Sequence, residues 1–385
     1  MLERRRVGEV PAKPHLRART AADGVLYEEC LTRAGFDGAF SMLYHEHRPH
    51  EALPVTPSVT LASSAVLAPR GLLRRHYRCL ELGAGGTSVE ARTPLLSNRD
   101  VTIGFLRPTA PDSVYFSNAD GDELFFVLEG SGFVRSGFGD LAFERGDYVC
   151  VPKGVLHRLI PTSGEAQAWL WLEFSGALGL PARYRNSIGQ LRMDAPYSHR
   201  DFRAPERVAP LDEGLRELAV KRRGVLHAYR SAHSPLDVVA WDGALYPFVL
   251  PILAFSPRVG QVHLPPPVHA TFEAPGALVC SFVPRPLDFH PEANPIPFPH
   301  SSVDVDEVLF YANGAFSSRR GIGPGSLSHH PAGIAHGPHP GAYEHESAEK
   351  TTSEVAVMLD CTAPLETTAA ALPLEDAGYH ASFVG

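Results

Sequence analysis

Histidine is concentrated in the second half of this sequence, where many of its 19 histidines lie between residues 290 and 345. His300 is followed by the acidic pair Asp306-Glu307, and His336 comes further along the chain. Two histidines and one carboxylate on one face of a metal ion form the ligand set typical of non-heme Fe(II) oxygenases, which keep the opposite face open for substrate and O₂. The sequence therefore predicts a metal site made by His300, Glu307 and His336.

The spacing between His300 and the acidic pair limits which carboxylate joins it. Side chains alternate along a strand, so residues six apart share a face and residues seven apart do not. His300 and Asp306 would share a face of a regular strand, whereas His300 and Glu307 need a bulge or a non-strand stretch between them. Residues 300–305 are polar and suit a loop. We therefore expect a break in strand geometry and Glu307 as the ligand, with Asp306 as second choice.

A twelve-residue pattern, GxxxxxPxGxxH, occurs twice, at 146–157 and at 325–336. Each copy lies downstream of an Asp-Glu pair, an apolar strand and a glycine, at 122–130 and at 306–314. The pattern combines a glycine turn, a strand, a Pro-x-Gly turn and an inward-facing histidine, and it is the second motif of the cupin barrel. The repeat predicts an all-β dominated bicupin, two fused double-stranded β-helix barrels with a few short helices.

The first copy of the repeat lacks most of the metal ligands. It keeps His157, but the matching acidic stretch, residues 118–123, contains no histidine. One imidazole among amides and carboxylates makes a poor site for a transition metal. We therefore expect His157 to be a structural hydrogen-bonding residue and the first barrel to be a scaffold.

The size and composition of the chain agree with two barrels. Its 385 residues exceed a typical single core, and its 34 glycines and 35 prolines favour short strands joined by turns. We expect an N-terminal extension with the degenerate barrel at 1–178, a connector at 179–228 and the metal-binding barrel at 229–385. Residues 211–228 form the best helix candidate, with Asp212 or Glu213 near its start.

The composition also argues against several classes of protein. The net charge is −8 with no basic block, which does not suit a nucleic-acid partner, and no apolar run is long enough to span a membrane. The charged start is not followed by an apolar signal core, so we expect no export. The five cysteines are odd in number and scattered, without CxxC spacing, which predicts free buried thiols in a reducing cytoplasm.

Long ordered stretches of the chain resemble the homogentisate 1,2-dioxygenase family, in the shorter form common in bacteria. The similar stretches cover nearly the whole length and are densest in its second half; they are 7–15, 23–29, 35–45, 120–123, 146–148, 185–191, 236–243, 262–272, 306–311 and 330–340. The resemblance implies a bicupin that uses Fe(II) and O₂ to cleave the ring of homogentisate to maleylacetoacetate, in tyrosine and phenylalanine catabolism. We further expect a cytoplasmic homo-oligomer that binds a small aromatic acid and O₂ as its substrates.

The resemblance also implies roles for residues around the metal site. His300, Glu307 and His336 match the iron ligands of the family. His263 matches the general base that acts on the substrate hydroxyl, a task for which a neutral imidazole is suited because its pKa lies near working pH. Arg319 falls where the family places a cation near the substrate carboxylate, and the resemblance points to His330 and Gly337 as part of the substrate pocket; His329 and His339 are expected beside the site or exposed.

Two segments depart from the pattern of the family and keep other functions open. Residues 13–19 differ from the usual basic and aromatic pattern, and residues 250–257 lack an acidic residue expected near Ala254. A paralogous dioxygenase for another hydroquinone or gentisate-like acid is therefore an alternative. A metal-dependent cupin isomerase and a non-catalytic, metal-binding bicupin are further alternatives, although an isomerase would want a fuller His-x-His set.

Overall fold

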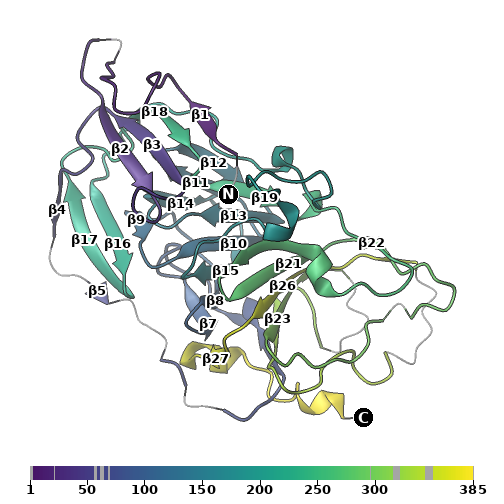
Figure 1. The fold of residues 1–385 in the computed structure, drawn as a ribbon. Helices are drawn as coiled ribbons and strands as arrows, with labels where there is room; N and C mark the ends of the chain where they lie inside the picture. The colour runs from purple at the N-terminus through teal and green to yellow at the C-terminus, as the bar shows by residue number, and fades with distance from the viewer. Residues whose placement is uncertain are drawn as a thin grey trace.

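The computed structural model describes residues 3–20, 22–55, 59–60, 65–67, 70–294, 296–314, 321–342 and 350–384. Its strands form two β-barrels and one smaller sheet, as the repeated motif predicts, and the all-β bicupin fold is confirmed (Figure 1). The described helices are short 3-10 turns, and they are η1 (Cys79–Glu81), η2 (Ala182–Tyr184), η3 (His199–Asp201), η4 (Ile252–Ala254), η5 (Pro266–His269), η6 (Ala369–Leu374) and η7 (Ala381–Phe383). None of the helices in this described part is long and apolar enough to cross a membrane.

The first barrel is built from two sheets. In order across the sheet, the strands of one are β19 (Phe248–Pro251), β13 (Asp147–Val151), β10 (Asp122–Glu129), β15 (Ala168–Phe174), β8 (Val101–Leu106), β7 (Thr93–Ser97) and β27 (Glu366–Thr367). Those of the other are β12 (Gly139–Phe143), β11 (Gly132–Ser136), β14 (His157–Pro161), β9 (Tyr115–Asn118), β16 (Glu217–Arg222), β17 (Val225–Ser231) and β4 (Ala52–Pro54), with β5 (Val59–Thr60) also on β17.

The second barrel and the small sheet complete the molecule. The main sheet of the second barrel contains β20 (Ala270–Ala274), β21 (Ala277–Phe282), β26 (Val355–Cys361), β23 (Asp306–Asn313), β24 (Ser326–His330) and β6 (Arg75–Arg78), and β22 (Arg285–Pro286) pairs with β25 (Thr351–Thr352). The small sheet contains β1 (Arg5–Val7), β18 (Val238–Gly243), β3 (Phe40–His45) and β2 (Tyr27–Thr32).

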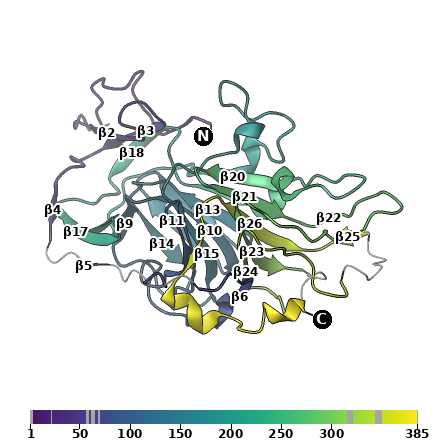
Figure 2. The same cartoon turned by 60° about the horizontal axis from the view of Figure 1, so that its bottom comes forward.

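Strands from one half of the chain complete the sheets of the other half. β6 comes from the first quarter of the sequence but pairs with β24 of the second barrel, while β19 and β27 flank the first barrel. Figures 1 and 2 show these segments lying beside strands of a different colour. Such additions cover sheet edges that would otherwise expose unpaired backbone groups. Because pairing crosses the expected boundaries near 178 and 228, those boundaries remain a proposal about folding units.

The expected helix at 211–228 is wrong, because this segment contains β16 and the start of β17. The two strands form an antiparallel hairpin joined by Arg223 and Gly224, whose φ angles are 54° and 70°. A two-residue loop with both φ angles positive matches the right-handed twist of a hairpin. The carboxylate of Asp120 accepts hydrogen bonds from both loop amides, at 2.6 and 2.8 Å, and thereby holds an arginine in a conformation that usually favours glycine or asparagine.

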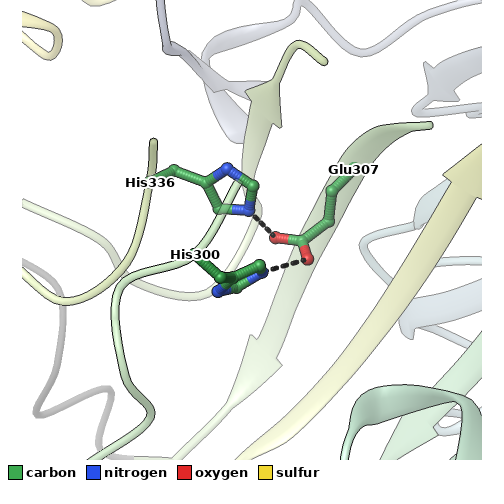
Figure 3. Close-up of side chains that lie close together, drawn as sticks. All are labelled: His300, Glu307 and His336. Atoms are coloured by element: carbon green, nitrogen blue, oxygen red, sulfur yellow. Dashed lines mark ion pairs between the residues drawn. The ribbon is translucent and has the colours of Figure 1, made fainter. Parts of the chain in front are cut away.

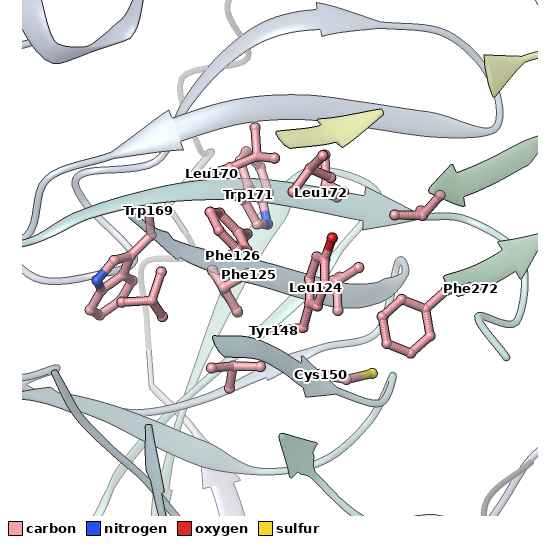
Figure 4. Close-up of a cluster of buried hydrophobic side chains, with 14 of the residues drawn as sticks. Leu124, Phe125, Phe126, Tyr148, Cys150, Trp169, Leu170, Trp171, Leu172 and Phe272 are labelled. Atoms are coloured by element: carbon pink, nitrogen blue, oxygen red, sulfur yellow. The ribbon is translucent and has the colours of Figure 1, made fainter. Parts of the chain in front are cut away.

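Aromatic side chains bury the contact between the two barrels. Phe126 on β10 packs on Phe310 of β23 with ring centroids 6.2 Å apart, and Tyr148 on β13 packs on Phe272 of β20 at 5.5 Å. Figure 4 shows Phe272, from a strand of the second barrel, in the same buried cluster as Tyr148 of the first barrel. Because side chains alternate along β23, Phe310 on the outer face places Glu307 on the inner face. The packing of the barrels therefore fixes which way the acidic residue points.

All five cysteines are free thiols, as expected. Four of them are buried, but Cys30 on β2 is exposed, so the expectation of uniformly buried thiols was wrong at this position. Cys30 lies on a strand of the small sheet, where alternate side chains face away from the core.

Candidate metal centre

The chain leaves regular strand geometry between His300 and Glu307, as the spacing predicts. Strand β23 begins at Asp306, and residues 301–305 lie outside any strand. His300 instead pairs with His336 as an isolated bridge, in which the backbone N–H of each residue donates to the carbonyl of the other at 2.8 Å. The bridge brings both imidazoles to the inner face of β23.

The three side chains converge around one point (Figure 3). His300 Nε2 lies 3.6 Å from Glu307 Oε2, and His336 Nε2 lies 3.4 Å from Glu307 Oε1. One potential ligand atom from each residue lies within 4.8 Å of the others. Two ligands about 2.1 Å from one metal ion and at right angles to each other are about 3 Å apart. The separations are therefore close to those of a coordinated ion.

The electrostatics of the centre suit a cation. Burial alone would raise the pKa of Glu307, but the adjacent imidazoles of His300, His330 and His336 hold it well below its usual range, so the carboxylate is charged. Nε2 of His336 is buried, and its 3.4 Å contact with Glu307 Oε1 is an ion pair rather than a well-formed hydrogen bond. A buried ring nitrogen beside a buried carboxylate is costly unless a further group pairs with it. The donor set of two imidazoles and one carboxylate fits a divalent transition metal.

Asp306, the second choice for the carboxylate ligand, lies on the other face of β23. Its two oxygens accept hydrogen bonds from the backbone amides of Ala332 and Leu365, each at 2.8 Å. One of them also lies 3.1 Å from His329 Nε2. Asp306 is therefore a structural anchor for two loops, and the structure brings Glu307 rather than Asp306 to the histidines.

His330 and Gly337, both expected in the substrate pocket, lie against the candidate metal ligands. His330 stands opposite Glu307 in the strand register, and its Nδ1 lies 2.9 Å from Glu307 Oε1. Its ring stacks on that of His336 at 4.6 Å. A Cβ atom at Gly337 would lie 2.7 Å from the Cα of Pro299, so the glycine permits close approach of the segments that carry His336 and His300.

The other predicted residues occupy different positions. His263 is half-buried, and its ring lies 5.3 Å from Phe298, which lies 6.4 Å from the ring of His300. Burial lowers the pKa of His263, so its imidazole is neutral near pH 7. Arg319 lies outside the described residues. In the first barrel His157 is fully buried and its Nδ1 lies 3.0 Å from the carbonyl of Val155, in keeping with a structural role.

Asp360 on β26 is a polar group near the centre that sequence reasoning missed. It stands opposite Glu307 in the β23–β26 register, so both carboxyl groups occupy the same face of the sheet. Burial and the negative charge of Glu307 raise the pKa of Asp360 to about 7. Asp360 also lines a cavity of about 810 Å³ between the two barrels. The pattern of the sequence gave no sign of it, because strand register was needed to place it.

The comparisons with known proteins match this chain over different lengths. A family described as "Homogentisate 1,2-dioxygenase N-terminal" matches residues 99–252. A protein named "Putative dioxygenase" from Saccharolobus solfataricus is 32% identical over 384 residues, which cover 98% of each chain. This chain belongs to the homogentisate 1,2-dioxygenase family.

Members of the family that carry its full name match a shorter part of the chain. The homogentisate 1,2-dioxygenase of Nitrobacter hamburgensis is 31% identical over 268 residues, which are 66% of this chain and 58% of that relative. The match to such relatives thus spans less than two thirds of their length. Among solved structures, a cupin 2 conserved barrel domain protein from Leptotrichia buccalis is similar at 8% identity with a TM-score of 0.35, covering 78% of this chain and all of that one.

Membership of the homogentisate 1,2-dioxygenase family and the geometry of the candidate metal centre both point to a dioxygenase. The relatives are dioxygenases by name, and the second barrel contains a possible metal site at His300, Glu307 and His336. The protein is thus a bicupin of a dioxygenase family.

Proposed function

We propose that this protein is an Fe(II)-dependent dioxygenase that cleaves the ring of homogentisate to give maleylacetoacetate. The observation that supports this most is the convergence of His300, Glu307 and His336 in the second barrel of a homogentisate 1,2-dioxygenase family member. Bound Fe(II) would supply a Lewis-acidic centre that engages both the substrate hydroxyl and O₂. The three side chains would hold it on the inner face of β23.

The residues around the centre have separate tasks in this proposal. His263 would take the proton of the substrate hydroxyl at a ring nitrogen, since a neutral imidazole is the form that accepts a proton. His330 would hold Glu307 in place through its Nδ1, at 2.9 Å. The lack of a side chain at Gly337 would let the segments that carry His336 and His300 approach each other closely. Arg319 would pair with the substrate carboxylate.

A second candidate is a paralogous dioxygenase for gentisate or another hydroquinone. The two substrates need an anion partner at different positions, because homogentisate carries its carboxylate one CH₂ group farther from the ring than gentisate does. The non-acidic segment at 250–257 is the departure that favours this alternative.

Oxygen consumption tests the proposal directly. The protein would be loaded anaerobically with Fe(II) and assayed in an oxygen electrode with homogentisate, gentisate and hydroquinone in turn. We expect uptake with homogentisate and a ring-opened product that absorbs in the near ultraviolet. Uptake with gentisate or hydroquinone alone would select the paralogue, and uptake with none of the three would contradict a ring-cleaving function.

The role of His263 needs a separate variant. His263→Ala should lower kcat and alter the acidic limb of the pH profile while leaving the iron content unchanged, because His263 is a base and not a ligand. An unchanged rate and pH profile would remove the base assignment.

A further inference from the structure

The loop that carries His336 leaves the sheet before the histidine is reached. Strand β24 ends at His330, and residues 331–340, here called the ligand loop, contain turns and one isolated bridge. A loop outside the ladder lacks the regular hydrogen bonds that fix a strand, so other contacts must position its side chains. Ligand geometry at a metal centre depends on such supporting contacts.

A segment distant in sequence, residues 375–384, lies beside the ligand loop and is here called the clamp segment. Its first residues are tied to β6, the strand that pairs with β24. Arg75 Nη1 lies 2.6 Å from Glu375 Oε1, and Arg78 Nη2 lies 2.8 Å from Asp376 Oδ2. The amide of Asp376 also donates to the carbonyl of His76 at 2.8 Å. Figure 2 shows the yellow end of the chain close to β6 and β24.

The last residues of the clamp segment contact His339, which is 1% exposed, so the exposed position that was one of the two expected for it is wrong. The ring of Phe383 stacks on that of His339, with centroids 3.9 Å apart and planes 28° from parallel. Ser382 Oγ donates its proton to the carbonyl of Tyr379 at 2.6 Å. The same oxygen lies 2.7 Å from His339 Nε2, so Nε2–H of His339 must be the donor.

Arg74 extends these contacts to the other side of His336. Its guanidinium lies 4.4 Å from the centroid of Phe383, and its Nε–H donates to the carbonyl of Ala335 at 2.9 Å. The clamp segment and Arg74 therefore hold the residue before His336 and the residue three positions after it. His336 therefore lies between two residues, Ala335 and His339, whose positions are held by contacts from other segments.

We propose that Phe383, Ser382 and Arg74 form a clamp that positions the metal ligand His336 through Ala335 and His339. These are positioning residues, since none of them belongs to the ligand group. The inference rests on the proposed metal-dependent function and adds to it a device that sets metal affinity. Removing such supporting contacts typically weakens metal binding about 10- to 100-fold.

Metal affinity of the folded protein tests the clamp. Wild type, Phe383→Ala, Phe383→Tyr and Val384→Ala would be titrated anaerobically with Fe(II) and with Co(II), the latter followed by its visible absorption. Val384 is 80% exposed, which makes Val384→Ala a matched control at the neighbouring position. We expect about tenfold weaker binding and a changed Co(II) spectrum for Phe383→Ala. The tyrosine variant keeps the stacked ring and should bind like wild type.

Ser382→Ala is the second variant, and it decides the test if Phe383→Ala does not fold. It removes the acceptor of His339 Nε2–H and should weaken metal binding about threefold. Wild-type affinity and spectrum in Phe383→Ala, or in Ser382→Ala where the former is unfolded, would overturn the clamp. A wild-type protein that binds neither Fe(II) nor Co(II) would instead overturn the proposed function on which the clamp rests.

Discussion

Strand β10 of the first barrel and strand β23 of the second begin with the same two residues, Asp-Glu. Asp122 accepts hydrogen bonds from the amides of Lys153 and Leu178, both at 2.7 Å. Asp306 accepts bonds from the amides at the equivalent turns of the second barrel, both at 2.8 Å. The aspartate therefore has the same structural task in both barrels, namely to hold the Pro-x-Gly turn and the loop that follows the neighbouring strand.

The glutamates that follow these aspartates have different partners. In the second barrel the carboxylate of Glu307 lies beside the imidazoles of His300, His330 and His336 at the candidate metal site. In the first barrel Glu123 is completely buried and lies 3.1 Å from a guanidinium nitrogen of Arg92, which is also nearly buried. Trp171 Nε1–H donates to the same carboxylate at 3.0 Å. A buried carboxylate needs a cation in either barrel, and the first barrel supplies one from its own chain.

Aromatic residues surround the guanidinium of Arg92 in the first barrel. His336 is bridged by His300, whereas His157 is paired with Phe116. The guanidinium of Arg92 lies 4.4 Å from the ring centroid of Phe116, and the rings of Phe125 and Trp171 also lie within 6 Å. A cation inside an aromatic cage is well stabilised. Glu123 of the first barrel is thus paired with a cation of the chain itself, whereas the residues around Glu307 of the second barrel could hold a metal ion.

The largest difference between the barrels should appear in metal binding. Glu307→Gln removes the charge that pairs with the metal and should weaken Fe(II) affinity at least about 100-fold and abolish turnover. Glu123→Gln, the matched change in the first barrel, should leave metal content per folded chain unchanged. Iron analysis of both proteins after anaerobic loading checks this, and equal metal loss in the two variants would remove the distinction between the barrels.

Stability should depend strongly on the internal cation of the first barrel. Arg92→Met leaves Glu123 buried beside no guanidinium and should lower the free energy of unfolding by about 3–5 kcal/mol. Urea denaturation measures the change, and Fe(II) affinity of the second barrel should stay as in wild type. The double variant Arg92→Met/Glu123→Gln serves as control and should regain part of the loss. A loss below about 1 kcal/mol in the single variant would contradict the role assigned to Arg92.

An effect confined to acidic pH concerns the histidine of the first barrel. Burial lowers the pKa of His157 to about 4 from an ordinary value of 6.5. The pKa of His157 is lower in the folded than in the unfolded protein. His157 therefore does not change the free energy of unfolding above pH 6.5, and it lowers this free energy progressively as pH falls toward 4. The loss is about 3 kcal/mol over that interval. His157→Gln should flatten this part of the pH profile in urea unfolding, and identical profiles for the two proteins would argue against a buried, neutral His157.

The sequence predicted the features that depend on local pattern. The repeat of glycine, proline and histidine spacing predicted two barrels, and strand alternation predicted that the chain must leave strand geometry between His300 and Glu307. The helix expected at 211–228 was wrong because Arg223 adopts a turn conformation that arginine rarely takes. That turn depends on Asp120, which lies about a hundred residues earlier and cannot be recognised as its partner from the sequence.

The sequence by itself determined which residues are ligand candidates. It also showed that the first barrel has no histidine at the place equivalent to His300. Only the tertiary structure decided that Asp306 is an anchor, that Arg92 is the cation beside Glu123, and that Asp360 stands opposite Glu307. Local pattern fixes which face a side chain occupies, because backbone geometry repeats over a few residues. The partner on that face comes from strand register and barrel packing across long separations, which the order of residues does not display.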